Sequence, residues 1–205
     1  MPLSKPRRTI SGASPRQRIV SGARHHFFAH GFRGVTMDDL AGQLGMSKKT
    51  LYAHFRSKGS LIEAVLHDKF QSVEADLRHI TSSPSFPSTL HRLLACIHQH
   101  TTEIQPPFLR DIRRDTPDLF RIVERRRRDI IQRHFAKVLS LGRRAGLVRK
   151  DVSARLSIEI LLAGVQGVMN PDKMAELDLT PTTGFSAIIG IFLEGVLTER
   201  GRSKL

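Results

Sequence analysis

Cysteine is nearly absent from this 205-residue sequence, which has Cys96 and no second thiol. A single cysteine cannot form an intrachain disulfide or a thiolate metal cluster, and its use fits a reducing cytoplasm. Long apolar runs are missing too, because the longest, around 158–169 and 188–197, are shorter than a bilayer span and are interrupted by Gln166 and Glu194. No apolar segment typical of a secretory signal follows the basic N-terminus. We therefore expect a cytoplasmic protein without a membrane anchor, with Cys96 in its core.

Acidic residues are also scarce, with 19 Asp and Glu against 33 Lys and Arg and a formal net charge of +14. Residues 1–58 contain eleven of the basic residues and only two acids, Asp38 and Asp39, so this part alone has a net charge of +9. Clustered basic side chains gain free energy by displacing counterions from phosphate. The N-terminal third is therefore the expected polyanion-binding part, although charge alone allows either nucleic acid or an anionic membrane.

Sequence patterns typical of enzymes are absent: there is no Walker loop, Gly-x-Ser-x-Gly elbow, His-Glu-x-x-His pair or dinucleotide fingerprint. No alternating β pattern of useful length occurs, and no repeat at solenoid periods. Apolar residues recur instead at helical spacing. We expect an all-α protein of about nine helices, with no catalytic residue and no cofactor.

The chain divides by composition into three parts. Residues 1–14 mix Pro, Ser, Gly and basic side chains without periodicity, which predicts a flexible arm. Residues 15–58 contain the first three helices, and residues 59–205 are expected to form a second, helical domain. After a fourth helix, punctuation by Pro and Gly predicts further helices at about 88–104, 108–114, 117–145, 151–169 and 182–199.

A helix-turn-helix is predicted in the basic part of the chain. Thr36 is a helix N-cap with Asp39 three residues later, Gly45 ends that helix, and Ser47 caps the next one. Apolar residues at i, i+3, i+4 and i+7 place one face of the first of these helices in the core: Met37, Leu40, Ala41 and Leu44. Two short helices joined by a tight turn containing Gly are typical of this DNA-binding motif.

The segment Gly31-Phe32-Arg33-Gly34-Val35-Thr36-Met37-Asp38-Asp39-Leu40-Ala41, with the run Thr50-Leu51-Tyr52-Ala53-His54-Phe55 that follows Ser47, resembles the DNA-binding domain of the TetR family over roughly residues 15–66. The resemblance implies a transcriptional repressor that binds a palindromic operator as a homodimer and responds to a small-molecule effector. It also implies contacts to the DNA backbone from Thr36, Tyr52, His54 and Lys58. The C-terminal part matches the family only in helix count and length.

The residues themselves point to the same surface. A helix presenting Lys48, Lys49, Thr50 and Tyr52 from its first turns offers hydrogen-bond donors to base edges in a major groove. The first turn after Ser47 also points free N–H groups at phosphate. The expected DNA-binding set is Thr36, Ser47, Lys48, Lys49, Thr50, Tyr52, His54 and Lys58. The simpler alternatives are a solvated lysine pair, a half-buried tyrosine and a surface histidine. Lys49 stands where the family often has small or acidic residues, so guanine-rich half-sites are expected.

Two sets of residues are expected in the C-terminal part. The first is a pocket for an effector that the sequence does not identify, because periodicity does not distinguish pocket from core. Its candidates are His98, Phe108, Phe120, His134, Phe135 and Met169. The second is a homodimer interface on the last two long helices, which are apolar around most of their circumference, unless both are central core helices. Its candidates are Leu161, Val165, Val168, Ile188, Ile191 and Phe192.

Other functions remain as alternatives. His26 and His30 have the i, i+4 spacing of metal ligands but no third ligand nearby, so no metal is expected. A nonspecific, nucleoid-type DNA-binding protein would explain the net charge. A small-molecule-binding helical protein or an enzyme with an incidental basic arm would explain the C-terminal part. The first alternative does not explain the large, weakly charged helical part, and the second does not explain the ordered motif from Thr36 to Lys58.

Overall fold

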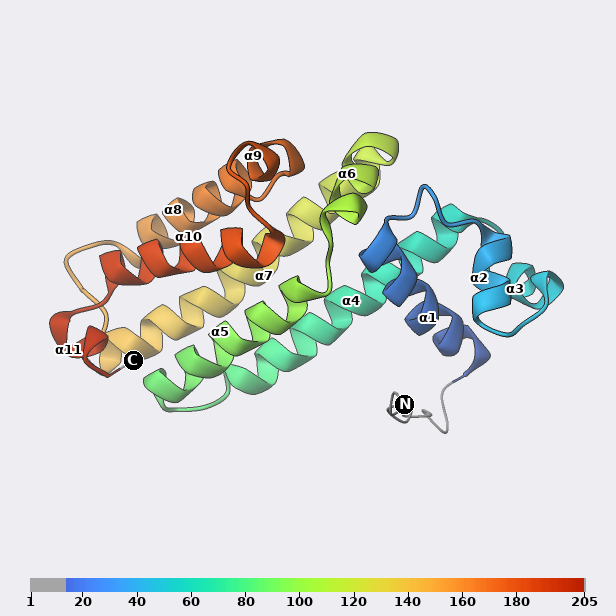
Figure 1. Ribbon diagram of the computed structural model, residues 1–205. Coiled ribbons are helices and arrows are strands. Elements are labelled where there is room, and N and C mark those ends of the chain that lie inside the picture. Colours follow the sequence, from blue (N-terminus) through green and yellow to red (C-terminus); the bar gives the residue numbers. More distant parts are fainter. Residues whose placement is uncertain (1–13, 205) are drawn as a thin grey trace, which may run out of the picture.

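The computed structural model describes residues 14–204, which form eleven helices (Figure 1). They are α1 (Pro15–His30), α2 (Met37–Gln43), α3 (Lys48–His54), α4 (Lys58–Ile80), α5 (Phe86–Thr102), α6 (Pro106–Asp115), α7 (Pro117–Arg144), α8 (Ala154–Val168), α9 (Pro171–Glu176), α10 (Pro181–Val196) and α11 (Glu199–Arg202). Within this range there is no β-strand, only an isolated antiparallel bridge between Val148 and Leu197. The all-α class expected from the sequence is confirmed.

All nine expected helices are present, and two short helices were not expected. These are α9, with six residues, and α11, with four. Helices this short do not complete two turns, so they leave no readable apolar period. The flexible arm expected for residues 1–14 lies outside the described residues except for Ser14. Among the described helices, none has the length and apolarity needed to cross a membrane.

Short hydroxyl side chains fix where the N-terminal helices begin. The Ser14 hydroxyl accepts a hydrogen bond from the Gln17 amide, and Ser47 accepts one from Thr50. Thr36 and Asp39 form a complete capping box, in which each side chain bonds to the backbone N–H of the other residue. These bonds satisfy amides that have no partner inside the helix. The predicted starts of α1, α2 and α3 are therefore confirmed, with the tight turn between α2 and α3 ending at Ser47.

The long helix α4 belongs to both hydrophobic cores of the molecule. Its first half shares a core with α1, α2 and α3, and its second half packs with α5 and α7 in a second core that α8 and α10 complete (Figure 1). The first core also contains Phe108 and Ile112 from α6. A movement of α4 or α6 would therefore reach the N-terminal helices directly.

The loop between α1 and α2 is attached to α6 by a close contact. Gly31 has φ +79°, and a Cβ atom at this position would collide with the Asp111 carboxylate. That carboxylate accepts a hydrogen bond of 2.9 Å from the Arg33 amide. Glycine is required here both for the positive φ and for the close approach. Gly31 therefore does more than end α1, because it also lets this loop approach α6 closely.

Candidate nucleic-acid interface and interior cavity

Helix α3 is held by its apolar side and presents its polar side to solvent. Leu51 is fully buried and Phe55, at the C-cap, is 3% exposed. The remaining side chains predicted to meet DNA are exposed: Lys48, Lys49, Thr50, Tyr52 and His54. The predicted facing of this helix is confirmed. Contact of these side chains with DNA stays a prediction.

The hydroxyl groups predicted to meet DNA already have intramolecular partners. Thr36 Oγ1 lies 2.6 Å from Asp39 Oδ2, and Ser47 Oγ lies 2.8 Å from Thr50 Oγ1. Both residues are exposed. Their hydroxyls organise the helix starts, where the free amides of the first turn and the helix dipole favour phosphate.

The two lysines at the start of α3 differ in their surroundings. The Lys48 ammonium forms an ion pair with Asp38 on α2, and this contact raises the pKa of Lys48. Lys49 is exposed, and among residues 14–204 its ammonium has no ion pair or hydrogen bond within contact distance. Asp38 therefore offsets part of the charge at Lys48, which leaves Lys49 as the stronger attraction for a polyanion.

Lys58 stands apart from the other predicted DNA contacts because its side chain is half-buried. Its Nζ donates to the carbonyl oxygens of Phe32 at 2.8 Å, Val35 at 3.1 Å and Arg33 at 3.3 Å. An ammonium has three donors, so all of them have partners inside the chain. Lys58 thus joins the start of α4 to the loop before α2. From the sequence, the Lys58 ammonium was expected to be free to bind phosphate. Its bonds to three carbonyl oxygens were not predicted.

An apolar cavity of about 190 Å³ lies inside the helical bundle. Four of the six effector-pocket candidates line it: Phe108, His134, Phe135 and Met169. His98 is exposed on α5, and Phe120 packs against the N-terminal core, so neither of these two predicted residues lines this cavity. Phe28 from α1 and Lys69 from α4 also line the cavity but were not predicted, because each lies on the apolar side of its helix, where a side chain is expected in the core.

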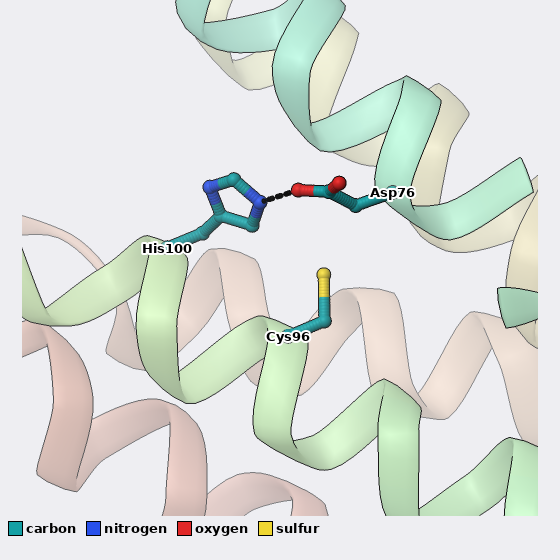
Figure 2. A group of neighbouring side chains, drawn as sticks. All are labelled: Asp76, Cys96 and His100. Carbon is teal, nitrogen blue, oxygen red and sulfur yellow. Dashed lines mark hydrogen bonds and ion pairs between the residues drawn. The ribbon is translucent and has the colours of Figure 1, made fainter. Parts of the chain in front are cut away.

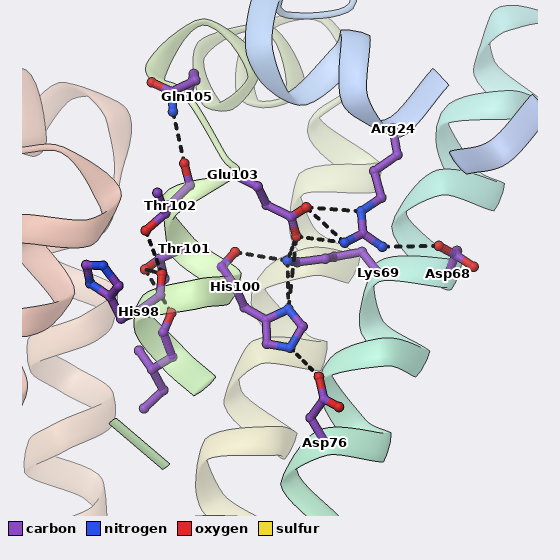
Figure 3. A network of polar contacts seen from close by, with 11 residues as sticks. Arg24, Asp68, Lys69, Asp76, His98, His100, Thr101, Thr102, Glu103 and Gln105 are labelled. Atoms are coloured by element: carbon purple, nitrogen blue, oxygen red, sulfur yellow. Dashed lines mark hydrogen bonds and ion pairs between the residues drawn. The ribbon is translucent and has the colours of Figure 1, made fainter. Parts of the chain in front are cut away.

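Two polar residues of the cavity wall, Lys69 and His100, belong to a chain of charged side chains that joins three helices (Figure 3). Lys69 is 5% exposed, and its Nζ lies 2.9 Å from both His100 Nδ1 and the His100 carbonyl oxygen. It also forms an ion pair with Glu103, which in turn binds Arg24 on α1. Burial, and next the charge of Arg24, lowers the pKa of Lys69, whereas contact with Glu103 favours the ammonium form.

Asp76, Cys96 and His100 bring three possible metal-ligand atoms within 4.8 Å of one another (Figure 2). His100 Nε2 lies 2.8 Å from Asp76 Oδ2. Burial raises the pKa of the Cys96 thiol to about 11, so the protonated form predominates at neutral pH. The Lys69 ammonium behind the imidazole would also repel a cation. We therefore assign no metal to this cluster.

The expected dimer residues divide according to their burial in a single chain. Leu161, Val165 and Phe192 are 1%, 2% and 8% exposed, so they pack in the chain's own core and leave almost no surface for a partner. Their burial argues against these three residues as interface contacts. Ile191, in contrast, is 77% exposed, and Val168 and Ile188 are half-buried. Both helices are apolar on two sides, and periodicity could not say which side faces inward.

Comparison with known proteins agrees with this arrangement of helices. The family model described as bacterial regulatory proteins, tetR family, matches residues 19–65. The chain is 25% identical over 191 residues to the HTH-type transcriptional repressor DhaR of Mycobacterium sp. (strain GP1), covering 85% of this chain and 92% of DhaR.

Two solved structures show the same fold. A TetR transcription regulator from Haloarcula marismortui has a TM-score of 0.69 and 18% identity, covering 89% of this chain and 98% of that one. The complex of SmeT with triclosan has a TM-score of 0.60 and 18% identity, covering 90% and 92%; SmeT is the repressor of a multidrug efflux pump of Stenotrophomonas maltophilia. Residues 19–65 thus match the tetR family model, and the chain as a whole shares the fold of these two structures.

Proposed function

We propose that this protein is a ligand-responsive transcriptional repressor that binds a palindromic operator as a homodimer. The observation that carries the proposal is the capped α2–turn–α3 unit, which is anchored by Leu51 and exposes Lys48, Lys49, Thr50 and Tyr52 together. A helix of this kind fits the major groove, where its donors can reach base edges. The chain acts as a regulator in the cytoplasm and not as an enzyme, as its relatives are transcriptional regulators.

The division of labour follows from the two cores. Residues 15–58 form the DNA-binding unit, and residues 59–205 form the effector-binding and dimerising unit. The two are not independent, since Leu61, Ile62, Val65 and Leu66 of α4 complete the core under α1, α2 and α3. An effector in the interior cavity acts on DNA binding through this shared packing. The triclosan complex of SmeT supports an organic effector for a protein of this fold.

Dimerisation is supported by an apolar surface on α8 and α10. Leu156, Ile160 and Ile191 are 53%, 57% and 77% exposed. Small exposed residues beside them would let the helices of a second chain approach closely: Ala163, Gly167, Ala187 and Gly190. Apolar surface of this kind is stabilised by burial, and a two-fold axis would place the same surface on both chains. The interface therefore consists of the solvent side of these helices, with Ile191 near its centre.

A gel-shift titration separates this function from its alternatives. The protein is titrated against a palindromic site selected from a random DNA pool and against a random duplex of equal length. A repressor binds the selected site about 10³-fold more tightly or better, with two chains per site. Equal affinity for both duplexes would indicate a nonspecific DNA-binding protein. Binding to neither would leave the basic N-terminal part without a role and contradict the proposal.

A further inference from the structure

The size of the interior cavity limits what it can hold. Its volume is about 190 Å³, whereas pockets for drug-sized ligands are usually about 300–1,000 Å³. An apolar cavity of about 150 Å³ is large enough for benzene. The cavity therefore fits a single substituted aromatic ring. Aromatic side chains from α1, α6, α7 and α10 form much of its wall: Phe28, Phe108, Phe135 and Phe185.

The charged groups of the wall offer little to a charged ligand. Lys69 is paired with Glu103 and His100, and Arg127 with Glu124. The Thr101 hydroxyl donates to a carbonyl of its own helix. No carboxylate is among the residues that line the cavity in the described part of the chain. An ionised ligand would lose its hydration and would have to break one of these pairs, which is costly in an apolar interior.

His134 is the exception among the polar residues of the wall. It is 1% exposed, and its Nε2 is buried without a hydrogen-bond partner among residues 14–204. The Thr81 hydroxyl donates its proton to the Leu77 carbonyl and lies 3.3 Å from His134 Nδ1. We assign the imidazole proton to Nδ1, because the hydroxyl, whose own proton is donated to Leu77, can only accept from the ring. Glu74 Oε1, at 3.7 Å from Nε2, is too far for a hydrogen bond.

The remaining ring nitrogen is therefore an acceptor. Burial lowers the pKa of His134, which keeps the imidazole neutral at pH 7 and leaves a lone pair on Nε2. A buried acceptor without a partner carries a desolvation cost that a ligand hydroxyl or N–H would remove.

We propose that the cavity binds a small, uncharged aromatic molecule with one hydrogen-bond donor, of the phenol class, with the ring among the phenylalanines and the donor on His134 Nε2. Phe28 and Phe108 meet edge to face in the wall, with ring centroids 4.8 Å apart. A ring that displaces either one shifts α1 or α6 against the DNA-binding core. This consequence for DNA rests on the repressor function proposed above, whereas ligand binding itself does not.

The ligand class is tested by calorimetry on the full-length protein at pH 7 without DNA. Three compounds of similar shape differ only in the polar group: 4-methylphenol, 4-methylanisole and 4-methylbenzoate. We expect 4-methylphenol to bind at least tenfold more tightly than 4-methylanisole, and 4-methylbenzoate to show no binding. Preference for the carboxylate, or no binding of either neutral compound, would overturn the proposal.

Two variants locate the site. Ile97 lines the cavity, and Ile97→Phe should abolish 4-methylphenol binding by filling it. Leu94→Phe on the same helix is the matched control, since Leu94 is half-buried but does not line the cavity. Circular dichroism checks that both fold. His134→Phe should remove the preference for the phenol over the methyl ether. Equal binding by Ile97→Phe and Leu94→Phe would place the ligand elsewhere and overturn the assignment.

Failure of this inference and failure of the repressor function are distinguishable. Sequence-specific DNA binding by a protein that binds no phenol contradicts the ligand class alone. Phenol binding by a protein that binds DNA without specificity supports the ligand class and contradicts the repressor. Release of the selected duplex by 4-methylphenol, but not by 4-methylbenzoate, supports both.

Discussion

The Arg24 guanidinium on α1 binds the Glu103 carboxylate at the C-terminal end of α5, with Nη2 at 3.0 Å from Oε1 and 2.9 Å from Oε2 (Figure 3). Its Nη1 lies 3.3 Å from Asp68 on α4. One side chain of the DNA-binding unit thus joins it to two helices that line the cavity. Arg24 and Glu103 are 23% and 32% exposed, so the pair is only partly screened by solvent.

Arg24→Met should lower the free energy of unfolding by about 1–3 kcal/mol, because it leaves Glu103 and Asp68 without their shared partner. Arg113→Met is the control: its partner Asp172 is 82% exposed, and loss of such a surface pair costs about 0–1 kcal/mol. Urea unfolding of both variants measures the difference. Equal losses would show that the Arg24 bridge contributes no more than a surface ion pair.

Stability should fall on mild acidification because of His134. Burial lowers its pKa below the usual histidine value of about 6.5; Glu74 acts against this shift, and Lys137 and Arg133 add to it. The unfolded chain then takes up the proton first as the pH falls, so the stabilising contribution is lost from about pH 6.5 down towards the folded pKa. His134→Phe should flatten the change in unfolding free energy between pH 7 and 5.5. The control His98→Gln, at an exposed site, should follow the wild type. A His134→Phe curve as steep as the wild type would refute this origin.

Lys58→Met should destabilise the N-terminal unit by about 1–3 kcal/mol, because three carbonyl oxygens lose their donor. Lys49→Met, at an exposed position, should change stability by no more than about 0.5 kcal/mol. Thermal unfolding distinguishes the two. The predicted backbone contact of Lys58 has its own readout, a fall of about one in the slope of log K against log salt. An unchanged slope would remove Lys58 from the DNA contacts.

Ile191→Glu should convert a dimer into monomers, since it places a charge on the apolar surface of α10 that is 77% exposed. Ile122→Glu on α7 is the matched control, because Ile122 is 52% exposed but lies on a different helix. Sedimentation equilibrium gives the mass of each. A dimeric Ile191→Glu protein would place the interface elsewhere, and a monomeric wild type would contradict the proposed operator geometry.

The sequence predicted the N-terminal third well because its information is local. Caps such as Thr36 and Ser47 act within three residues, and the burial of Leu51 and Phe55 follows from helical spacing. Even there, the three carbonyl partners of Lys58 were not predictable, because they lie 23 to 26 residues away along the chain.

The C-terminal part was less predictable because its key contacts are between distant segments. Phe28 and Lys69 line the cavity from helices assigned to the DNA-binding side or to the core. On α8 and α10, the apolar pattern covers both sides of each helix, so it placed Leu161 in the interface when it faces inward. Hydrophobic periodicity shows that one side of a helix is apolar. It does not show whether that side packs in the chain's own core or against a second chain.

The recognition role of α3 is tested most directly by the affinity ratio between a selected palindromic duplex and a random duplex at one fixed salt concentration. The comparison uses the wild type, the double variant Lys49→Ala/Tyr52→Ala, and the control Lys150→Ala, which removes one exposed lysine far along the chain. We expect a ratio of about 10³ or more for the wild type and the control, and a much smaller ratio for the double variant. A double variant that keeps the full ratio would contradict sequence recognition by α3.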